Sequence, residues 1–91
     1  MTMLNNLEAL VNNMTGRRGL RQEWEGIDDD IRDEIIEDWQ EIVRNASNSN
    51  DAVGKIIEDL QNRGGLDNAW DDIDEEIRSE IREEWVEILE G

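Results

Sequence analysis

Carboxylates are the side chains through which this chain could do chemistry. Its 91 residues include 25 aspartates and glutamates against nine lysines and arginines, and neither histidine nor cysteine is present. Paired carboxylates can transfer protons as general acid and base. Here acids recur at every expected helical turn, so no pair stands out, and the usual general base and thiolate nucleophile are missing. We therefore predict no catalytic residue, no cofactor and no enzymatic activity.

Two runs of acids, at residues 28–30 and 71–76, suggest a cation site at first sight. An EF-hand calcium loop needs oxygen ligands at alternating positions, a central glycine and a closing glutamate. Neither run has that pattern, and acids at the start of a helix favour the positive end of its dipole. We interpret both runs as helix-capping residues and predict no metal site.

The net charge of −16 restricts the partners that the chain can bind. Such a surface repels nucleic acids and anionic membranes, and it attracts basic proteins over ~8–10 Å. Adaptation to high salt is an alternative, supported by one lysine against eight arginines, whereas nine asparagines and eleven isoleucines argue against it. The chain has no signal-peptide pattern and no segment of the ~20 apolar residues that span a bilayer. We expect a cytoplasmic protein without membrane contact.

The sequence repeats itself with an offset of 46 residues. Residues 19–43 align without gaps with residues 65–89, and 13 of the 25 aligned pairs are identical. The identical pairs are Gly19/Gly65, Leu20/Leu66, Trp24/Trp70, Ile27/Ile73, Asp28/Asp74, Ile31/Ile77, Arg32/Arg78, Glu34/Glu80, Ile35/Ile81, Glu37/Glu83, Trp39/Trp85, Glu41/Glu87 and Ile42/Ile88. Apolar residues align at the same offset before this segment, so the duplication covers nearly the whole chain.

Each repeat is predicted to hold a helix of about three turns, a short helical turn and a long helix. The predicted ranges are 2–14, 20–24 and 28–44 in the first repeat, and 51–62, 66–70 and 71–90 in the second. Gly16 and Gly64 are the expected C-terminal stops, and Asp28 and either Asp71 or Asp74 the expected N-caps.

One repeat alone is too short to bury its apolar stripe. We therefore predict an all-α fold in which two tandem helical hairpins pack as a pseudo-twofold four-helix bundle, with up to six helices if the short turns are counted. The repeat units are residues 1–46 and 47–91, joined by a polar linker at residues 45–50 and forming one shared compact domain.

The long helices are predicted to be amphipathic. On a helical wheel one arc is apolar, and it contains Ile27, Ile31, Ile35, Trp39, Ile42, Ile73, Ile77, Ile81, Trp85 and Ile88. The opposite half is acidic and supplies the candidate partner-binding residues Asp29, Asp30, Asp33, Glu34, Glu37, Glu41, Asp72, Glu75, Glu76, Glu80, Glu83 and Glu87. Their density, about one charge per 3 Å, is close to the ~3.4 Å of one DNA strand. We expect the two acidic arcs to lie side by side as one continuous surface.

The four tryptophans occupy equivalent positions in the two repeats. Trp39 and Trp85 fall on the apolar arc and are predicted to lie in the core. Trp24 and Trp70 precede the long helices and are predicted to cover the core, with half-exposed partner anchors as the alternative.

Basic residues gather at one place, where Arg17, Arg18 and Arg21 follow the first helix. Arg63 repeats the pattern weakly in the second unit. We expect these arginines to pair with neighbouring acids or helix C-termini.

These features favour a binding protein that occupies the nucleic-acid-binding surface of a basic partner. DNA-mimic inhibitors of phages and mobile elements, of the anti-restriction or anti-CRISPR type, offer the analogy in size, charge and charge density. The alternatives are an immunity or antitoxin-like module, and a scaffold whose acidity serves solubility or salt adaptation. Direct binding of nucleic acid is not expected, and homodimerisation stays open.

Overall fold

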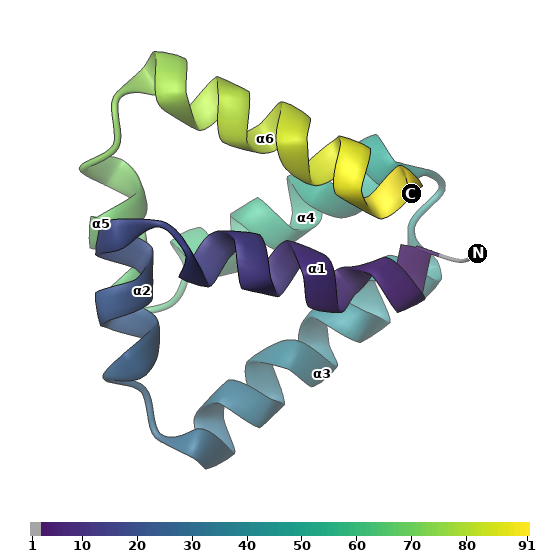
Figure 1. The fold of residues 1–91 in the computed structure, drawn as a ribbon. Coiled ribbons are helices and arrows are strands. Elements are labelled where there is room, and N and C mark those ends of the chain that lie inside the picture. Colours follow the sequence, from purple (N-terminus) through teal and green to yellow (C-terminus); the bar gives the residue numbers. More distant parts are fainter. Residues whose placement is uncertain (1–2) are drawn as a thin grey trace.

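The computed structural model describes residues 3–91, which contain six helices (Figure 1). They are α1 (Met3–Thr15), α2 (Arg18–Glu25), α3 (Asp29–Asn45), α4 (Ser49–Gln61), α5 (Leu66–Asp71) and α6 (Glu75–Glu90). No strand occurs within these residues, and the predicted all-α class is confirmed. The first repeat supplies α1 to α3 and the second supplies α4 to α6; Thr2, expected to begin the first helix, lies outside the described residues.

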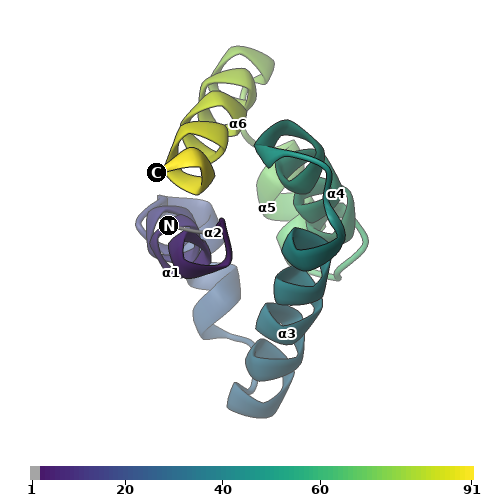
Figure 2. The same cartoon turned by 90° about the vertical axis from the view of Figure 1, so that its right-hand side faces the viewer.

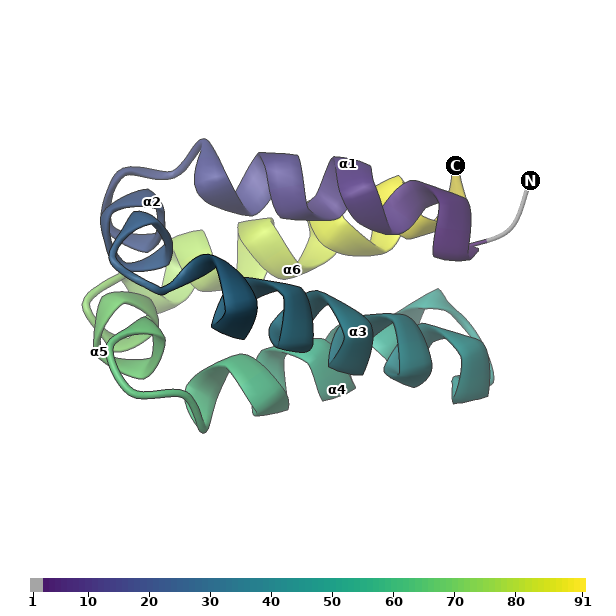
Figure 3. The same cartoon turned by 90° about the horizontal axis from the view of Figure 1, so that it is seen from below.

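The four longer helices lie in two layers, and the two short helices close one end. α1 lies beside α6 in one layer and α3 beside α4 in the other, so each layer contains a helix from each repeat (Figures 2 and 3). α2 packs against α5 at the left in Figure 1. The repeats are therefore interleaved, while the predicted pseudo-twofold pairing of two hairpins stays a prediction.

A single hydrophobic core receives side chains from all six helices of the described chain. Trp39 and Trp85 are completely buried in it, which confirms their predicted place. Each packs against the short-helix tryptophan of its own repeat, with ring centroids 6.3 Å apart for Trp24–Trp39 and 5.8 Å apart for Trp70–Trp85. Trp24 and Trp70 are 7% and 3% exposed, so they cover the core, and the alternative that they are half-exposed anchors is wrong.

Hydrogen bonds from the buried indoles join the two repeats. Trp39 of α3 donates its indole N–H to Asp59 Oδ2 of α4 over 2.7 Å, and Trp85 of α6 donates to Asn13 Oδ1 of α1 over 2.9 Å. Asn13 and Asp59 are equivalent positions of the duplication. A buried indole N–H needs an acceptor, and in both repeats that acceptor comes from the other repeat.

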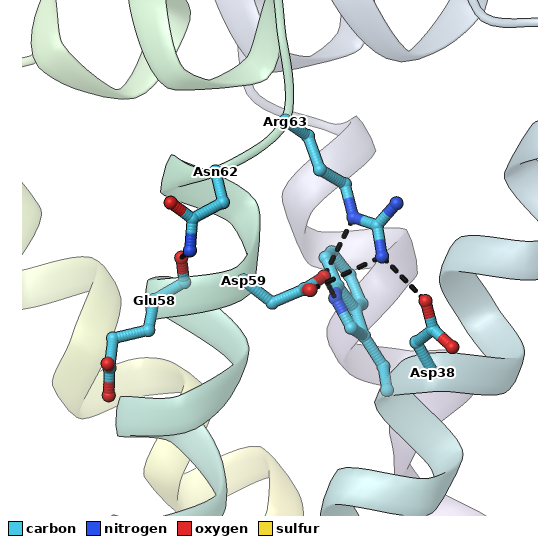
Figure 4. A network of polar contacts seen from close by, with 6 residues as sticks. Asp38, Glu58, Asp59, Asn62 and Arg63 are labelled. Carbon is cyan, nitrogen blue, oxygen red and sulfur yellow. Dashed lines mark hydrogen bonds and ion pairs between the residues drawn. The ribbon is translucent and has the colours of Figure 1, made fainter.

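Two arginines at equivalent positions of the repeats add hydrogen bonds to these indole acceptors. Arg63 donates to Asp59 Oδ2 and to Asp38 Oδ2 over 2.7 and 2.8 Å (Figure 4). Burial lowers the pKa of Arg63, but its hydrogen bonds to Asp59 and Asp38 outweigh that effect and leave the pKa above its ordinary value. Arg17 likewise donates to Asn13 and forms an ion pair with Glu84 of α6.

The expected pairing of the basic cluster with acids is thus confirmed for Arg17 and Arg63. Arg18 and Arg21 are exposed on α2.

The buried stripe of the long helices differs from the predicted one. In α3, the side chains that face the core are Ile35, Trp39 and Val43, spaced four residues apart. Ile31, one turn before them, is 44% exposed. In α6 the corresponding buried residues are Ile81, Trp85 and Leu89, and Ile77 is 43% exposed. The first turns of α3 and α6 extend to the outer corners of the molecule, away from the other long helices (Figure 1).

Two predicted boundaries are also wrong. The second long helix begins at Glu75, because α5 continues to Asp71 and Asp74 takes an extended conformation that interrupts the helix. Asp28 and Asp74 hold the N-cap positions of α3 and α6, but neither side chain makes a capping hydrogen bond. The non-helical linker is shortened to residues 46–48.

The start of α4 is capped by side chains. Asn48 Oδ1 accepts a hydrogen bond from the backbone N–H of Asp51 over 2.9 Å, and Asp51 Oδ2 accepts one from the N–H of Ser47 over 3.1 Å. The hydrogen bond from Ser47 is the main cause that lowers the pKa of Asp51 below its ordinary 3.8, with Lys55 contributing and desolvation opposing. This arrangement resembles a capping box.

The corrected stripe predicts unequal costs for equal truncations on α3. Ile35→Ala should destabilise the fold by about 2–5 kcal/mol, because it leaves a cavity in the core. Ile31→Ala should cost less than about 1 kcal/mol, because the side chain is half exposed. Urea denaturation followed by tryptophan fluorescence measures both, and Ile35→Val, at about 1 kcal/mol, serves if the alanine variant does not fold. Equal costs at the two positions would contradict the assigned stripe.

The α4 cap predicts a pH-dependent difference. Because the folded pKa of Asp51 is lowered, its stabilising effect is present above the ordinary value and disappears as the pH falls through the folded pKa. Asp51→Asn should therefore lower the thermal midpoint at about pH 7 and leave it unchanged at about pH 2. Glu58→Gln removes the same charge from the same helix without breaking a cap. If both variants shift the midpoint alike near pH 7, the cap has no specific effect.

Candidate functional site

The carboxylates of α3 and α6 form two exposed acidic rows. The α3 row consists of Asp29, Asp30, Asp33, Glu34, Glu37, Asp38 and Glu41. The α6 row consists of Glu75, Glu76, Glu80, Glu83, Glu84, Glu87 and Glu90. Every member is exposed, because the buried stripe of each helix holds the opposite face against the core.

All twelve predicted partner-binding residues are exposed, and eleven of them belong to the two rows. The exception is Asp72, which was expected on the long helix. It lies in the turn between α5 and α6, where its backbone N–H caps α5. The alignment of Asp28 with Asp74 contained the signal for this boundary, because it marks the equivalent turn in both repeats.

Few of these charges are neutralised by neighbouring cations. Asp29 pairs with Arg32, Asp38 with Arg63 and Glu84 with Arg17. Among residues 3–91, the other eleven of the fourteen row carboxylates form no ion pair. The rows therefore keep most of their negative charge on the surface.

The two rows lie on opposite sides of the molecule. α1 and α4 run between α3 and α6, which diverge toward the end formed by α2 and α5 (Figures 1 and 2). The molecule measures 32 × 31 × 20 Å along its principal axes, and α3 and α6, which carry the rows, follow two of its outer edges. The expected single continuous acidic surface is therefore wrong, because the interleaved repeats separate the helices that carry it.

Each row by itself keeps a charge spacing close to that of a nucleic-acid strand. α3 has seven carboxylates in 17 residues and α6 has seven in 16. At 1.5 Å per residue, this is about one charge per 3.5 Å of helix axis, against ~3.4 Å along one DNA strand. The resemblance is to one strand, since the rows do not lie next to each other as the two strands of a duplex do.

Metal sites, membrane spans and surface depressions were compared with the two rows. Within the described residues, no group of three or more acidic, histidine or cysteine side chains is placed to hold a metal ion. No described helix has both the length and the apolar character that crossing a bilayer requires. On α6 a shallow depression of about 400 Å³ is lined by Ile77, Arg17, Glu80, Glu83, Glu84 and Glu87.

A groove between α1 and α3 is the feature that the sequence did not predict. It has a volume of about 530 Å³, and its apolar lining includes the half-buried Leu4, Val11 and Ile36. The equivalent position of Ile36 in the second repeat is Arg82, which lies against Gly54 of α4. The exchange of an isoleucine for an arginine was the available signal that the two repeats differ here.

Comparisons of the chain with protein-family models, with curated proteins and with solved structures find no match.

The unneutralised charge predicts that salt stabilises the fold. Repulsion among exposed carboxylates weakens as the Debye length shrinks from ~10 Å at 0.1 M to ~3 Å at 1 M salt. The thermal midpoint, measured by circular dichroism, should therefore rise as sodium chloride is increased from about 0.05 to about 0.5 M. A midpoint that is constant or falls over this range would show that the rows do not strain the fold.

Proposed function

We propose that this protein binds a basic protein through the acidic rows of α3 and α6, and that it occupies a surface where the partner otherwise binds nucleic acid. The observation that supports the proposal best is the exposure of both rows, in which eleven of fourteen carboxylates form no ion pair with residues 3–91. Carboxylates free of local partners are available to cations on another molecule.

The regular charge spacing indicates which kind of surface the partner has. A nucleic-acid-binding groove presents lysines and arginines at intervals that match phosphates. A helix with one carboxylate per ~3.5 Å offers such a groove a comparable series of charges on a rigid support. The protein would then act as an inhibitor of the DNA-mimic type.

The separation of the rows changes how such a decoy would work. A groove shaped for a duplex contacts both strands on adjacent sides, whereas the two rows here lie on opposite edges. We therefore propose that each row occupies a separate basic groove. Either two partner molecules bind one to each edge, or one partner encloses the protein from both sides.

A second candidate is a scaffold whose acidity only maintains solubility. It is favoured by exposed acids outside the rows, at Glu8, Glu23, Glu25 and Glu58 on three other helices. An immunity-like module that recognises its partner through Trp24 and Trp70 is disfavoured, because both indoles are buried.

Matched charge variants separate the two candidates. The row variant carries Glu34→Gln, Glu37→Gln, Glu80→Gln and Glu83→Gln, and the control variant carries Glu8→Gln, Glu23→Gln, Glu25→Gln and Glu58→Gln. Both remove four carboxylates of one residue type from exposed positions. Tagged wild type and variants are used to capture proteins from a lysate, with elution by a salt gradient and competition by duplex or single-stranded DNA.

The proposal predicts a basic captured protein that salt elutes and DNA displaces. Its affinity for the row variant should fall about tenfold or more at moderate salt, and its affinity for the control variant should change much less. Equal losses with both variants, or capture that is insensitive to salt and DNA, would contradict binding through the rows.

A further inference from the structure

Two exposed isoleucines border the acidic rows at equivalent places in the two repeats. Ile31 of α3 and Ile77 of α6 are 44% and 43% exposed, and they are the two large apolar side chains most exposed within the described chain. The same feature at both copies shows that it belongs to the duplicated unit and not to one local irregularity.

The surroundings of these isoleucines are anionic. One helical turn away along the same face, Ile31 is flanked by Asp28 and Glu34, and Ile77 by Asp74 and Glu80. Ile77 also lines the depression on α6 together with four glutamates and Arg17. Each exposed apolar side chain therefore lies at the edge of the apolar stripe and has carboxylates on its outer side.

The core does not account for their exposure. The fully buried residues of α3 and α6 begin one turn later, at Ile35 and Ile81, and both of these are 1% exposed. A solvated first turn would be served equally well by a polar residue, as it is at the neighbouring row positions. The exposed part of each isoleucine gains free energy only when something apolar covers it.

We infer that Ile31 and Ile77 are apolar anchors beside the two rows, and that the partner presents an apolar side chain among cationic ones, as a basic amphipathic helix can. This inference rests on the proposed function and specifies the kind of surface that the partner presents. The surrounding carboxylates select cationic side chains by charge complementarity, and the isoleucine selects an apolar group among them. A groove that contacts only phosphates would gain nothing from the isoleucine.

Two synthetic helical peptides test the inference directly. Both have the same length and the same lysines on one face, and they differ in having leucine or glutamine between the lysines on that same face. Their affinities are measured by fluorescence anisotropy at low salt against wild type, the double variant Ile31→Ser with Ile77→Ser, and the conservative control Ile31→Leu with Ile77→Leu. Circular dichroism and tryptophan fluorescence verify that both variants are folded.

The leucine peptide should bind wild type more tightly than the glutamine peptide. Less than half of each isoleucine remains to be buried, which corresponds to about a fivefold preference per site. The serine variant should lose this preference and the leucine variant should keep it.

Each other outcome overturns a defined part of the argument. Equal binding of both peptides to wild type would refute the anchors and leave ionic binding through the rows intact. A leucine preference that persists in the serine variant would place the apolar contact elsewhere, with the α1/α3 groove as the first place to examine. Binding of neither peptide would refute the anchors and the proposed function together.

Discussion

The structure depends on two buried indole N–H groups whose acceptors lie in the other repeat. Trp39 donates to Asp59 and Trp85 donates to Asn13. A buried donor without an acceptor costs roughly 1–3 kcal/mol, and each repeat avoids this cost through an acceptor in the other repeat. Arg63 and Arg17 hold the two acceptors in place. The two repeats are therefore joined by hydrogen bonds in the core as well as by apolar packing.

The interleaving that satisfies the tryptophans also determines where the charge goes. α1 and α4 occupy the middle of the molecule, and α3 and α6 are displaced to opposite edges (Figures 1 and 2). Their inner stripes face the shared core, so the carboxylates face outward along the two edges. Spreading the charge over separate edges also keeps the rows apart, which reduces the repulsion that a net charge of −16 imposes on a small fold.

Separate rows imply a different kind of recognition from a duplex-like surface. A single helix with a regular series of carboxylates supplies long-range attraction, and that attraction has little specificity of its own. An exposed isoleucine beside each row adds a short-range contact that depends on shape and apolar character. The two terms together would let a strongly acidic protein distinguish one basic partner from many.

Much of this architecture followed from the sequence because it is encoded locally. Helical periodicity located six helices with small errors at their ends, and the offset of 46 residues revealed the duplication. The same periodicity placed Trp39 and Trp85 in the core and all twelve predicted row and turn acids on the surface. Burial of one face and solvation of the other are properties of each helix separately.

The features that depend on contacts between helices were decided only by the tertiary structure. A helical wheel places Ile31 and Ile77 on the apolar arc, and only the packing of the helices shows that they are exposed. It likewise cannot show that Asp59 and Asn13 accept hydrogen bonds from the opposite repeat. The relative position of the two acidic rows was decided in the same way, because periodicity defines the faces of a helix and not its neighbours.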